Sequence, residues 1–241
     1  MPQIIIGDIQ IDVVLKRIKN IHLSVHPPDG RVRISAPAKM DFNRIRSFAF
    51  SKIEWIKKKQ KKIQNRVTLP PKQFITGETH FFLGKSYDLN VFEGKIKPDV
   101  VLNENSIDLY VKKNSDIRNR FSVLESWYRY NLNIIALELI RKWEKIMDVS
   151  IDEFRIKKMK TRWGTCNRKA KRIWLNSELA KRPIQSIEYI VVHELIHLLE
   201  RNHNERFYAL MTNFLPDWKS YRKELNSFPV SAENFMNKEV D

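Results

Sequence analysis

The pattern of apolar and polar positions predicts a strand-rich start followed by a helix. Residues 21–26 and 31–37 alternate apolar and polar side chains and flank a Pro-Pro-Asp-Gly turn, so we expect a β-hairpin. From Asp41 the apolar residues recur at three- and four-residue steps. This spacing predicts a helix over 41–66 with Asp41 as its N-cap.

A second strand-rich stretch precedes a long helical one. Residues 80–94 and 99–113 each hold two apolar runs separated by a turn signal, and they predict two more hairpins. Over 116–147 the apolar residues again follow three- and four-residue steps. That region is therefore expected to form one long helix or two consecutive ones.

The last part of the chain mixes strands with shorter helices. Strand-like runs at 154–166 and 172–176 lead to a strongly apolar helix expected over 184–200. Pro183 stands at the start of this helix, where a missing N–H costs nothing. A further helix is expected over 205–214.

These elements indicate an α+β protein with three portions. Residues 1–68 are expected to form a β-hairpin and a helix, and residues 69–114 a β-rich portion that packs with them. Residues 115–241 are expected to form a mainly helical domain. The chain has 241 residues and is 42% hydrophobic, which is enough for a substantial core.

Composition indicates the compartment. Cys166 is the single cysteine, so an internal disulfide is impossible and a reducing environment fits. The N-terminus lacks a basic segment followed by a long apolar run, and no apolar run approaches the ~20 residues that span a bilayer. We therefore expect a cytoplasmic protein that does not bind membranes, and its oligomeric state stays open.

The apolar helix carries an H-E-x-x-H motif. His193 and His197 are four residues apart, so both imidazoles lie on one helix face and can bind the same metal ion. Glu194 stands beside the first ligand and can act as general base on a water molecule. The alternative is that both histidines are ordinary helix residues and that Glu194 is a surface acid.

A zinc site needs a third protein ligand and one open position. His203 follows His197 by six residues, so a straight helix would carry it away from the metal. The chain must turn near Asn202, and asparagine tolerates the left-handed conformation that such a turn can require. With that turn, His203 becomes the third ligand.

The motif and its surroundings resemble a known family. RWGTC from Arg162, RIWLN from Arg172 and IEYIVVHELIHLLERNHNERFYALMTNFLPDW from Ile187 are similar to the YgjP-type metal-dependent hydrolases. These are related to the SprT and WLM-type zinc metallopeptidases and, more distantly, to the gluzincins. The similarity is close over 162–218 and loose in the N-terminal part, and Thr165 stands where the family usually has serine.

This resemblance implies a zincin-like catalytic domain with an edge strand or hairpin beside the motif helix. It places zinc, or another divalent metal, on His193, His197 and His203 and makes Glu194 the base. Because gluzincins take a glutamate from a later helix as third ligand, reserve candidates are Glu205, Asp217 and Glu224.

A basic segment is expected to border the site. Residues 155–182 contain eleven Lys or Arg residues and one acid, Glu178, so they carry +10 of the net charge of +16. The resemblance implies that this segment packs beside the motif helix, where it would attract anions. The alternative is a solvated basic face without a partner.

Six further residues are candidates for substrate contacts or for supporting the metal ligands. They are Arg162, Trp163, Gly164, Asn176, Arg206 and Tyr208. Among them, Arg162, Arg206 and Tyr208 are candidates to stabilise the transition state. Asn176 has an alternative role as a cap of the following turn, and Cys166 is expected to be a buried thiol rather than a ligand.

Three functions fit these observations. The first is a zinc-dependent peptidase that uses Glu194 as general base. The second is a metal-dependent hydrolase of nucleotides or other small anions, which the basic segment favours. The third is a protease associated with nucleic acid, although the sequence contains no recognised nucleic-acid reader module.

Overall fold

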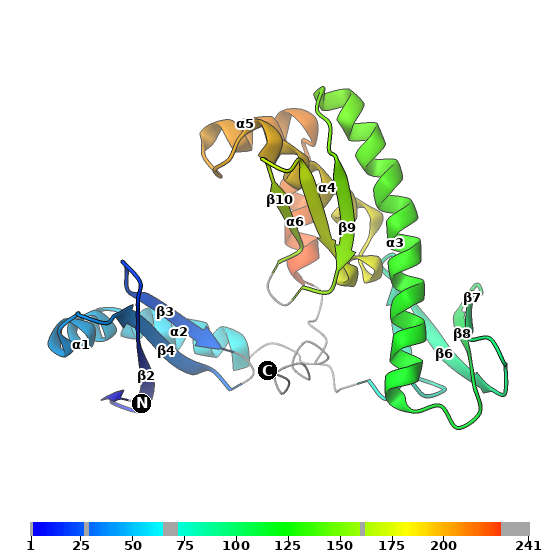
Figure 1. Ribbon diagram of the computed structural model, residues 1–241. Coiled ribbons are helices and arrows are strands. Elements are labelled where there is room, and N and C mark those ends of the chain that lie inside the picture. Colours follow the sequence, from blue (N-terminus) through cyan, green and yellow to red (C-terminus); the bar gives the residue numbers. More distant parts are fainter. Residues whose placement is uncertain (1, 27–28, 65–71, 160–161, 228–241) are drawn as a thin grey trace. The chain divides into compact units, whose positions relative to one another are not determined.

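The computed structural model describes residues 2–26, 29–64, 72–159 and 162–227 and divides the chain into two compact units (Figure 1). The first unit is formed by the chain up to Pro70, and the second by 71–228. Each unit has its own buried apolar cluster. No helix in the described part of the chain is both long and apolar enough to cross a membrane.

The first unit is a four-stranded sheet with two helices. Its strands have the order β1-β2-β4-β3, and the elements are β1 Gln3–Ile6, β2 Ile9–Lys16, β3 His22–His26, β4 Arg31–Pro37, α1 Phe42–Ser51 and α2 Ile53–Gln64. The hairpin β3–β4 is confirmed, and so is the Asp41 N-cap, whose side chain accepts a hydrogen bond from Asn43 N–H. The single helix expected over 41–66 is instead two helices that meet at Lys52.

The second unit begins with another four-stranded sheet. Both hairpins expected from the sequence are present, and the strand order is β5-β6-β8-β7, with β5 Thr79–Phe82, β6 Lys85–Glu93, β7 Asp99–Leu102 and β8 Ser106–Val111. Leu89 and Leu109 of this sheet share a core with Leu124 and Leu132 of α3 (Ile117–Met147). The sheet therefore packs in the core of the second unit, and the boundary expected at residue 114 does not separate two cores.

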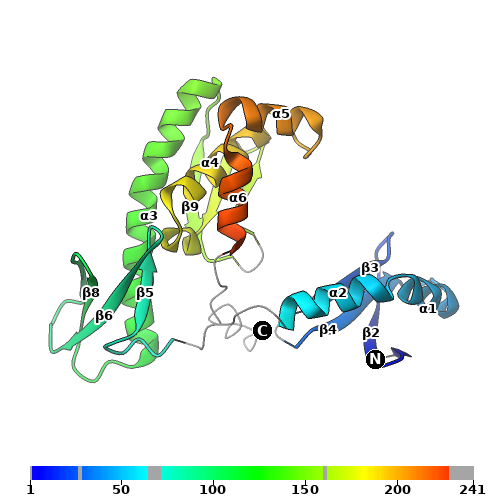
Figure 2. The ribbon, with the colours of Figure 1, turned by 180° about the vertical axis from the view of Figure 1, so that it is seen from behind.

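Helix α3 is a single helix of 31 residues, not two. Its N-cap is Asp116, which accepts a hydrogen bond from Asn119 N–H at 2.7 Å. Its C-cap is Asp148, in the left-handed conformation at φ 52°. Figure 2 shows α3 running alongside both the β5–β8 sheet and the elements that carry the motif.

The remaining elements include the motif helix α4. They are β9 Glu153–Lys157, β10 Gly164–Asn167, β11 Arg172–Asn176, the short 3-10 helix η1 Ser177–Lys181, α4 Ile184–Leu199, α5 Glu205–Phe214 and α6 Trp218–Ser227. The strand order β10-β11-β9 leaves β10 at the edge, and β10 contacts α4. The α+β class and the edge strand beside the motif helix are thus confirmed.

Candidate metal centre

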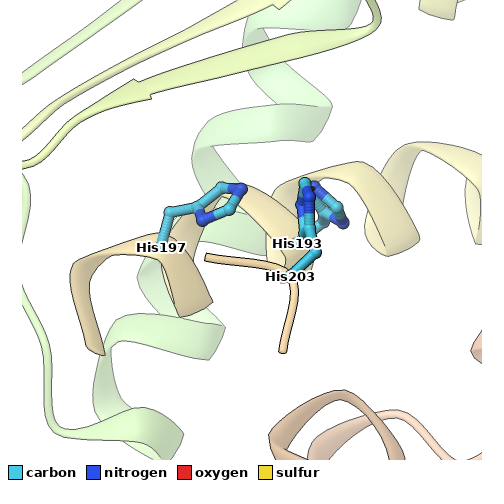
Figure 3. Close-up of side chains that lie close together, drawn as sticks. All are labelled: His193, His197 and His203. Carbon is cyan, nitrogen blue, oxygen red and sulfur yellow. Dashed lines mark hydrogen bonds between the residues drawn. The ribbon is translucent and has the colours of Figure 1, made fainter. Parts of the chain in front are cut away.

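One face of α4 presents two imidazoles. His193 and His197 are partly buried, whereas Val191, Val192 and Leu195 on the other faces are fully buried. The helix is held by its apolar side, so the positions of the two histidine backbones are fixed by core packing. Their rings lie 5.0 Å apart, centroid to centroid (Figure 3).

The chain turns sharply after α4 and brings a third imidazole back. Glu200 leaves the helix in an extended conformation, and its side chain accepts a hydrogen bond from Asn202 N–H. Asn204 then caps α5 by accepting a hydrogen bond from Phe207 N–H at 3.0 Å. No residue of the turn over 200–204 has a positive φ. The prediction that Asn202 adopts a left-handed conformation in this turn was therefore wrong.

The turn places His203 beside His193. Their Nε2 atoms are 3.0 Å apart, and one nitrogen from each of the three histidines lies within 4.8 Å of the others. Two nitrogens bound to one tetrahedral zinc ion at about 2.0–2.1 Å would be about 3.4 Å apart. The three donors therefore fit a single metal ion, and among the described residues no other group of this kind is found.

Hydrogen bonding orients His197. Its Nδ1 lies 3.1 Å from the carbonyl oxygen of Glu200, so Nδ1 carries the proton and Nε2 keeps its lone pair for a metal. His193 is held neutral as well, because burial, with help from His197 and His203, lowers its pKa to about 3. Metal binding requires neutral imidazoles, so both rings are ready to act as ligands.

Phe207 packs against all three imidazoles. The distances from its ring centroid to those of His193, His197 and His203 are 5.0, 4.9 and 4.6 Å. The side chain is fully buried, on the inner face of α5. It therefore limits the rotation of the three rings, a role that the sequence analysis missed.

Glu194 lies against the edge strand. It is 5% exposed, and a Cβ atom placed on Gly164 would be 2.6 Å from its Oε1 and 2.7 Å from its Cγ. Only glycine leaves room for the carboxylate there. Burial raises the pKa of Glu194 to about 8, against a smaller lowering effect of Arg162. A bound cation would oppose this rise.

A cavity of about 1660 Å³ opens around the three histidines and Glu194. Its wall contains six basic side chains, which form no ion pair with a described residue: Arg162, Arg168, Lys169, Lys171, Arg201 and Arg222. Apart from Glu194, Asp148 is the only acid that the described part of the chain contributes to the wall. The cavity is therefore strongly basic. The segment 155–182 supplies four of these cations, while the loop after α4 and helix α6 supply the others.

The predicted supporting residues divide into two groups. Arg162, Trp163 and Gly164 line the cavity, whereas Arg206 and Tyr208 of α5 do not. Cys166 lies on β10 in the cavity wall, but it is outside the group of metal donors. Its thiol stays protonated, because burial, aided by Glu194, raises its pKa to about 11.

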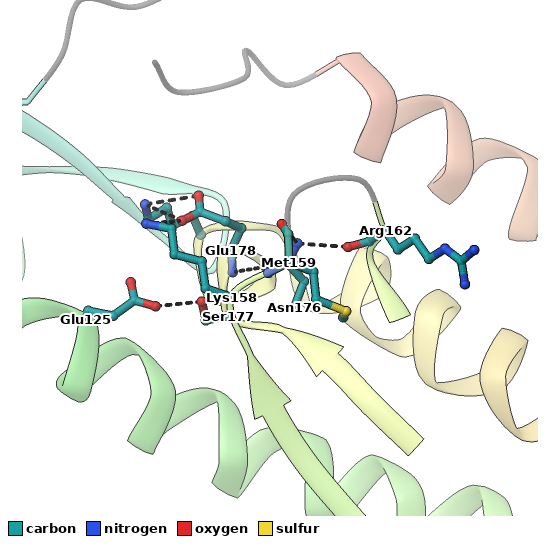
Figure 4. Close-up of polar contacts among 8 residues, drawn as sticks. Glu125, Lys158, Met159, Arg162, Asn176, Ser177 and Glu178 are labelled. Atoms are coloured by element: carbon teal, nitrogen blue, oxygen red, sulfur yellow. Dashed lines mark hydrogen bonds and ion pairs between the residues drawn. The ribbon is translucent and has the colours of Figure 1, made fainter. Parts of the chain in front are cut away.

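Asn176 supports the fold near the site. It donates hydrogen bonds to the carbonyl oxygens of Met159 and Arg162 at 2.9 and 2.8 Å, and it accepts one from Glu178 N–H (Figure 4). It is the N-cap of η1. The alternative role as a turn cap is therefore the observed one, and Asn176 does not line the cavity.

Tyr189 and Arg222 are among the cavity residues that the sequence analysis did not name. Tyr189 lies one helical turn before His193, and Arg222 comes from α6. Burial raises the pKa of Tyr189, while Arg222 lowers it to a smaller extent. The four-residue step from Tyr189 to His193 was visible in the sequence, but no local signal could place α6 at the cavity.

Similarity to individual known proteins is low. A comparison with curated proteins found no match. Among solved structures, the metallopeptidase zymogen abylysin of Pyrococcus abyssi is 20% identical over 37% of this chain and 90% of that chain, with a TM-score of 0.35. The zymogen jannalysin of Methanocaldococcus jannaschii is 23% identical over 39% and 93%, with a TM-score of 0.33.

The family comparison covers most of the chain. A family model described as a YgjP-like metallopeptidase domain matches residues 19–228. This range includes the three histidines, Glu194 and every residue that lines the cavity. The chain therefore belongs to the YgjP-like family and is a metallopeptidase-type, metal-dependent hydrolase.

Proposed function

We propose that this protein is a zinc peptidase in which His193, His197 and His203 hold the metal and Glu194 is the general base. The observation that carries the proposal is the convergence of three imidazole nitrogens within 4.8 Å, beside a buried carboxylate. Three neutral nitrogen donors without a thiolate are typical of catalytic zinc sites. When bound, zinc would polarise a carbonyl and make water more acidic.

In this proposal Glu194 moves the proton. It would accept a proton from the attacking water as the new C–O bond forms, and it would later give that proton to the leaving amine as the C–N bond breaks. Gly164 keeps the carboxylate close to β10. Because β10 is an edge strand in the cavity wall, an extended peptide could pair with its free side.

The test is Glu194→Gln, with Glu138→Gln on the exposed surface of α3 as matched control. Zinc-loaded wild-type protein and the control should digest unfolded casein, and Glu194→Gln should lose at least about 1000-fold in kcat, as expected when an essential proton-transfer group is removed. Zinc content should stay at one ion per chain in all three. Full activity of Glu194→Gln would contradict the proposal.

The basic cavity favours a second candidate, hydrolysis of a nucleotide or another phosphoanhydride. Six cations face the site, and a neutral peptide bond does not require them. We would offer the four nucleoside triphosphates and a peptide library to the same preparation. Release of phosphate that depends on Glu194, without peptide cleavage, would favour the nucleotide; the reverse would favour a peptidase for acidic segments.

A further inference from the structure

Tyr189 stands on the same face of α4 as the two helix ligands. It precedes His193 by four residues, which places the two side chains one above the other on the helix. It lines the cavity together with His193, Glu194 and Arg222. Tyr189 therefore belongs to the cavity wall next to His193.

The ring of Tyr189 is held rigidly. It is 6% exposed, it stacks on Trp218 at 6.4 Å with an interplanar angle of 11°, and it meets His193 edge-on at 5.9 Å. Trp218 is itself buried and donates a hydrogen bond to Thr212 Oγ1. A side chain packed between two rings keeps its position when a substrate enters.

The hydroxyl of Tyr189 has no hydrogen-bond partner among the described residues. The oxygen is not one of the fully buried unpaired polar atoms of the described residues, so it is accessible to solvent. Since the residue lines the cavity, its donor is available to a molecule bound there. The fold thus leaves an oriented hydrogen-bond donor available beside His193.

We infer that Tyr189 is a catalytic residue whose hydroxyl stabilises the oxyanion of the transition state. This inference rests on the proposed hydrolase function. As water adds to the substrate carbonyl, the π electrons move to its oxygen, and the Tyr189 O–H donates a hydrogen bond to that oxygen without losing its proton. When the carbonyl re-forms, the pair returns and the amine leaves with the proton from Glu194.

Tyr189 suits this role better than the residues that the sequence suggested. Arg206 and Tyr208 do not line the cavity, and Arg162 lines it from an exposed position. A donor stabilises a developing charge best when it is already oriented and shielded from water. Of these four side chains, Tyr189 alone is both buried and part of the cavity wall.

The experiment compares Tyr189→Phe with Tyr221→Phe, which removes a hydroxyl from α6 outside the cavity. Both variants keep the aromatic ring. For Tyr189→Phe we expect kcat on casein to fall about 100-fold, as for loss of one oxyanion donor. KM should change less than about twofold, because the lost bond forms only in the transition state. Tyr221→Phe should match the wild-type protein.

A binding measurement supplies a readout other than activity. The probe is a phosphinic pseudo-tripeptide with alanine side chains, which copies the tetrahedral geometry, and its Kd for each zinc-loaded protein is measured by calorimetry. We expect Tyr189→Phe to weaken binding of this probe at least about 10-fold. Zinc affinity and melting temperature should equal those of the wild-type protein.

The outcomes separate the two proposals. Wild-type protein that neither cleaves casein nor binds the probe would overturn the peptidase function and this inference with it. Wild-type protein that does both, with Tyr189→Phe unchanged in kcat and in probe affinity, would overturn only the inference. Equal losses in kcat and zinc affinity would show that Tyr189 merely supports the metal ligands, which also overturns it.

Discussion

Two buried glutamates of the second unit lie in opposite surroundings. Glu178 at the start of η1 is 3% exposed and lies 3.1 Å from Lys181 and 3.8 Å from Lys158. Glu194 on α4 is 5% exposed and forms no hydrogen bond or ion pair with a described residue. Both side chains are removed from water, but only Glu178 has partners that compensate for the loss of hydration.

Their acidities differ accordingly. Burial alone would raise both pKa values; at Glu178 the neighbouring cations Lys181, Lys158 and Arg182 outweigh it and lower the pKa below its ordinary value. At Glu194 burial prevails and the pKa is raised. A carboxylate with its partners in place stabilises the fold, whereas one without partners is available for a metal-bound substrate and a proton. The difference separates an acid that stabilises the fold from the acid that we propose as the general base.

The strongest test of this comparison is the pair Glu178→Gln and Glu194→Gln. Glu178→Gln should lower the free energy of unfolding by about 3 kcal/mol, since it leaves the buried cations without their counter-charge. Glu194→Gln should leave it unchanged or raise it by about 1 kcal/mol, because the folded wild-type protein must either bury an unpartnered charge or take up a proton at Glu194, whose pKa burial raises to about 8. Urea denaturation of the full chain measures both, and equal destabilisation would refute the distinction.

A third buried ionisable group, His80, extends the comparison to the pH dependence of stability. His80 on β5 is 5% exposed, and burial is the largest cause that lowers its pKa to about 4; Glu78, 3.2 Å away, opposes the shift. In the folded protein His80 therefore stays neutral at pH values between about 4 and 6.5, where the same side chain in the unfolded chain is protonated. Stability is fully present above pH 6.5 and falls as the pH drops from there to about 4, by about 3 kcal/mol for a shift of this size.

Replacing His80 isolates this contribution. His80→Gln should lose most of the decrease in stability between pH 6.5 and 4, while the remaining pH dependence of the protein persists. Thermal unfolding of both proteins across this range gives the measurement. An unchanged pH profile in the variant would mean that His80 is not the group that titrates.

Gly164→Ala tests the unpaired carboxylate of Glu194 from the neighbouring edge strand β10. The added Cβ would lie 2.6 Å from Glu194 Oε1, so the carboxylate must move or β10 must shift away from α4. We expect kcat to fall about 100-fold, because small displacements of a catalytic group have large effects. Zinc affinity should change little, since the atoms nearest to the added Cβ all belong to Glu194 and not to a histidine. An unchanged kcat in Gly164→Ala would show that the added Cβ does not displace the Glu194 carboxylate.

The smallest expected effect concerns the packing of the ligands. Phe207→Leu keeps an apolar side chain but removes the ring that contacts all three imidazoles. We expect zinc affinity to fall about tenfold, as when a group that orients metal ligands is changed. Phe214→Leu, on the same helix but packed on Trp143, is the control. Equal zinc affinity of all three proteins would show that the turn alone positions His203.

Much of the local structure follows from short-range signals. The N-caps Asp41 and Asp116 precede helices, and the hairpins form at the predicted turns, because capping and turn formation depend on a few neighbouring residues. The break at Lys52 was missed because apolar periodicity continues through it. The partner of the β5–β8 sheet was also misjudged, since an apolar strand face does not specify which core it joins.

The sequence by itself determined that His193, Glu194 and His197 share a helix, because a spacing of four residues fixes a common face wherever that helix packs. Only the tertiary structure decided how His203 returns, why position 164 must be glycine and which cations reach the cavity. These features join residues that are ten to sixty positions apart, through the turn after α4, the contact of β10 with α4 and the placement of α6. Such contacts depend on how separate elements pack, and no local pattern of side chains encodes that packing.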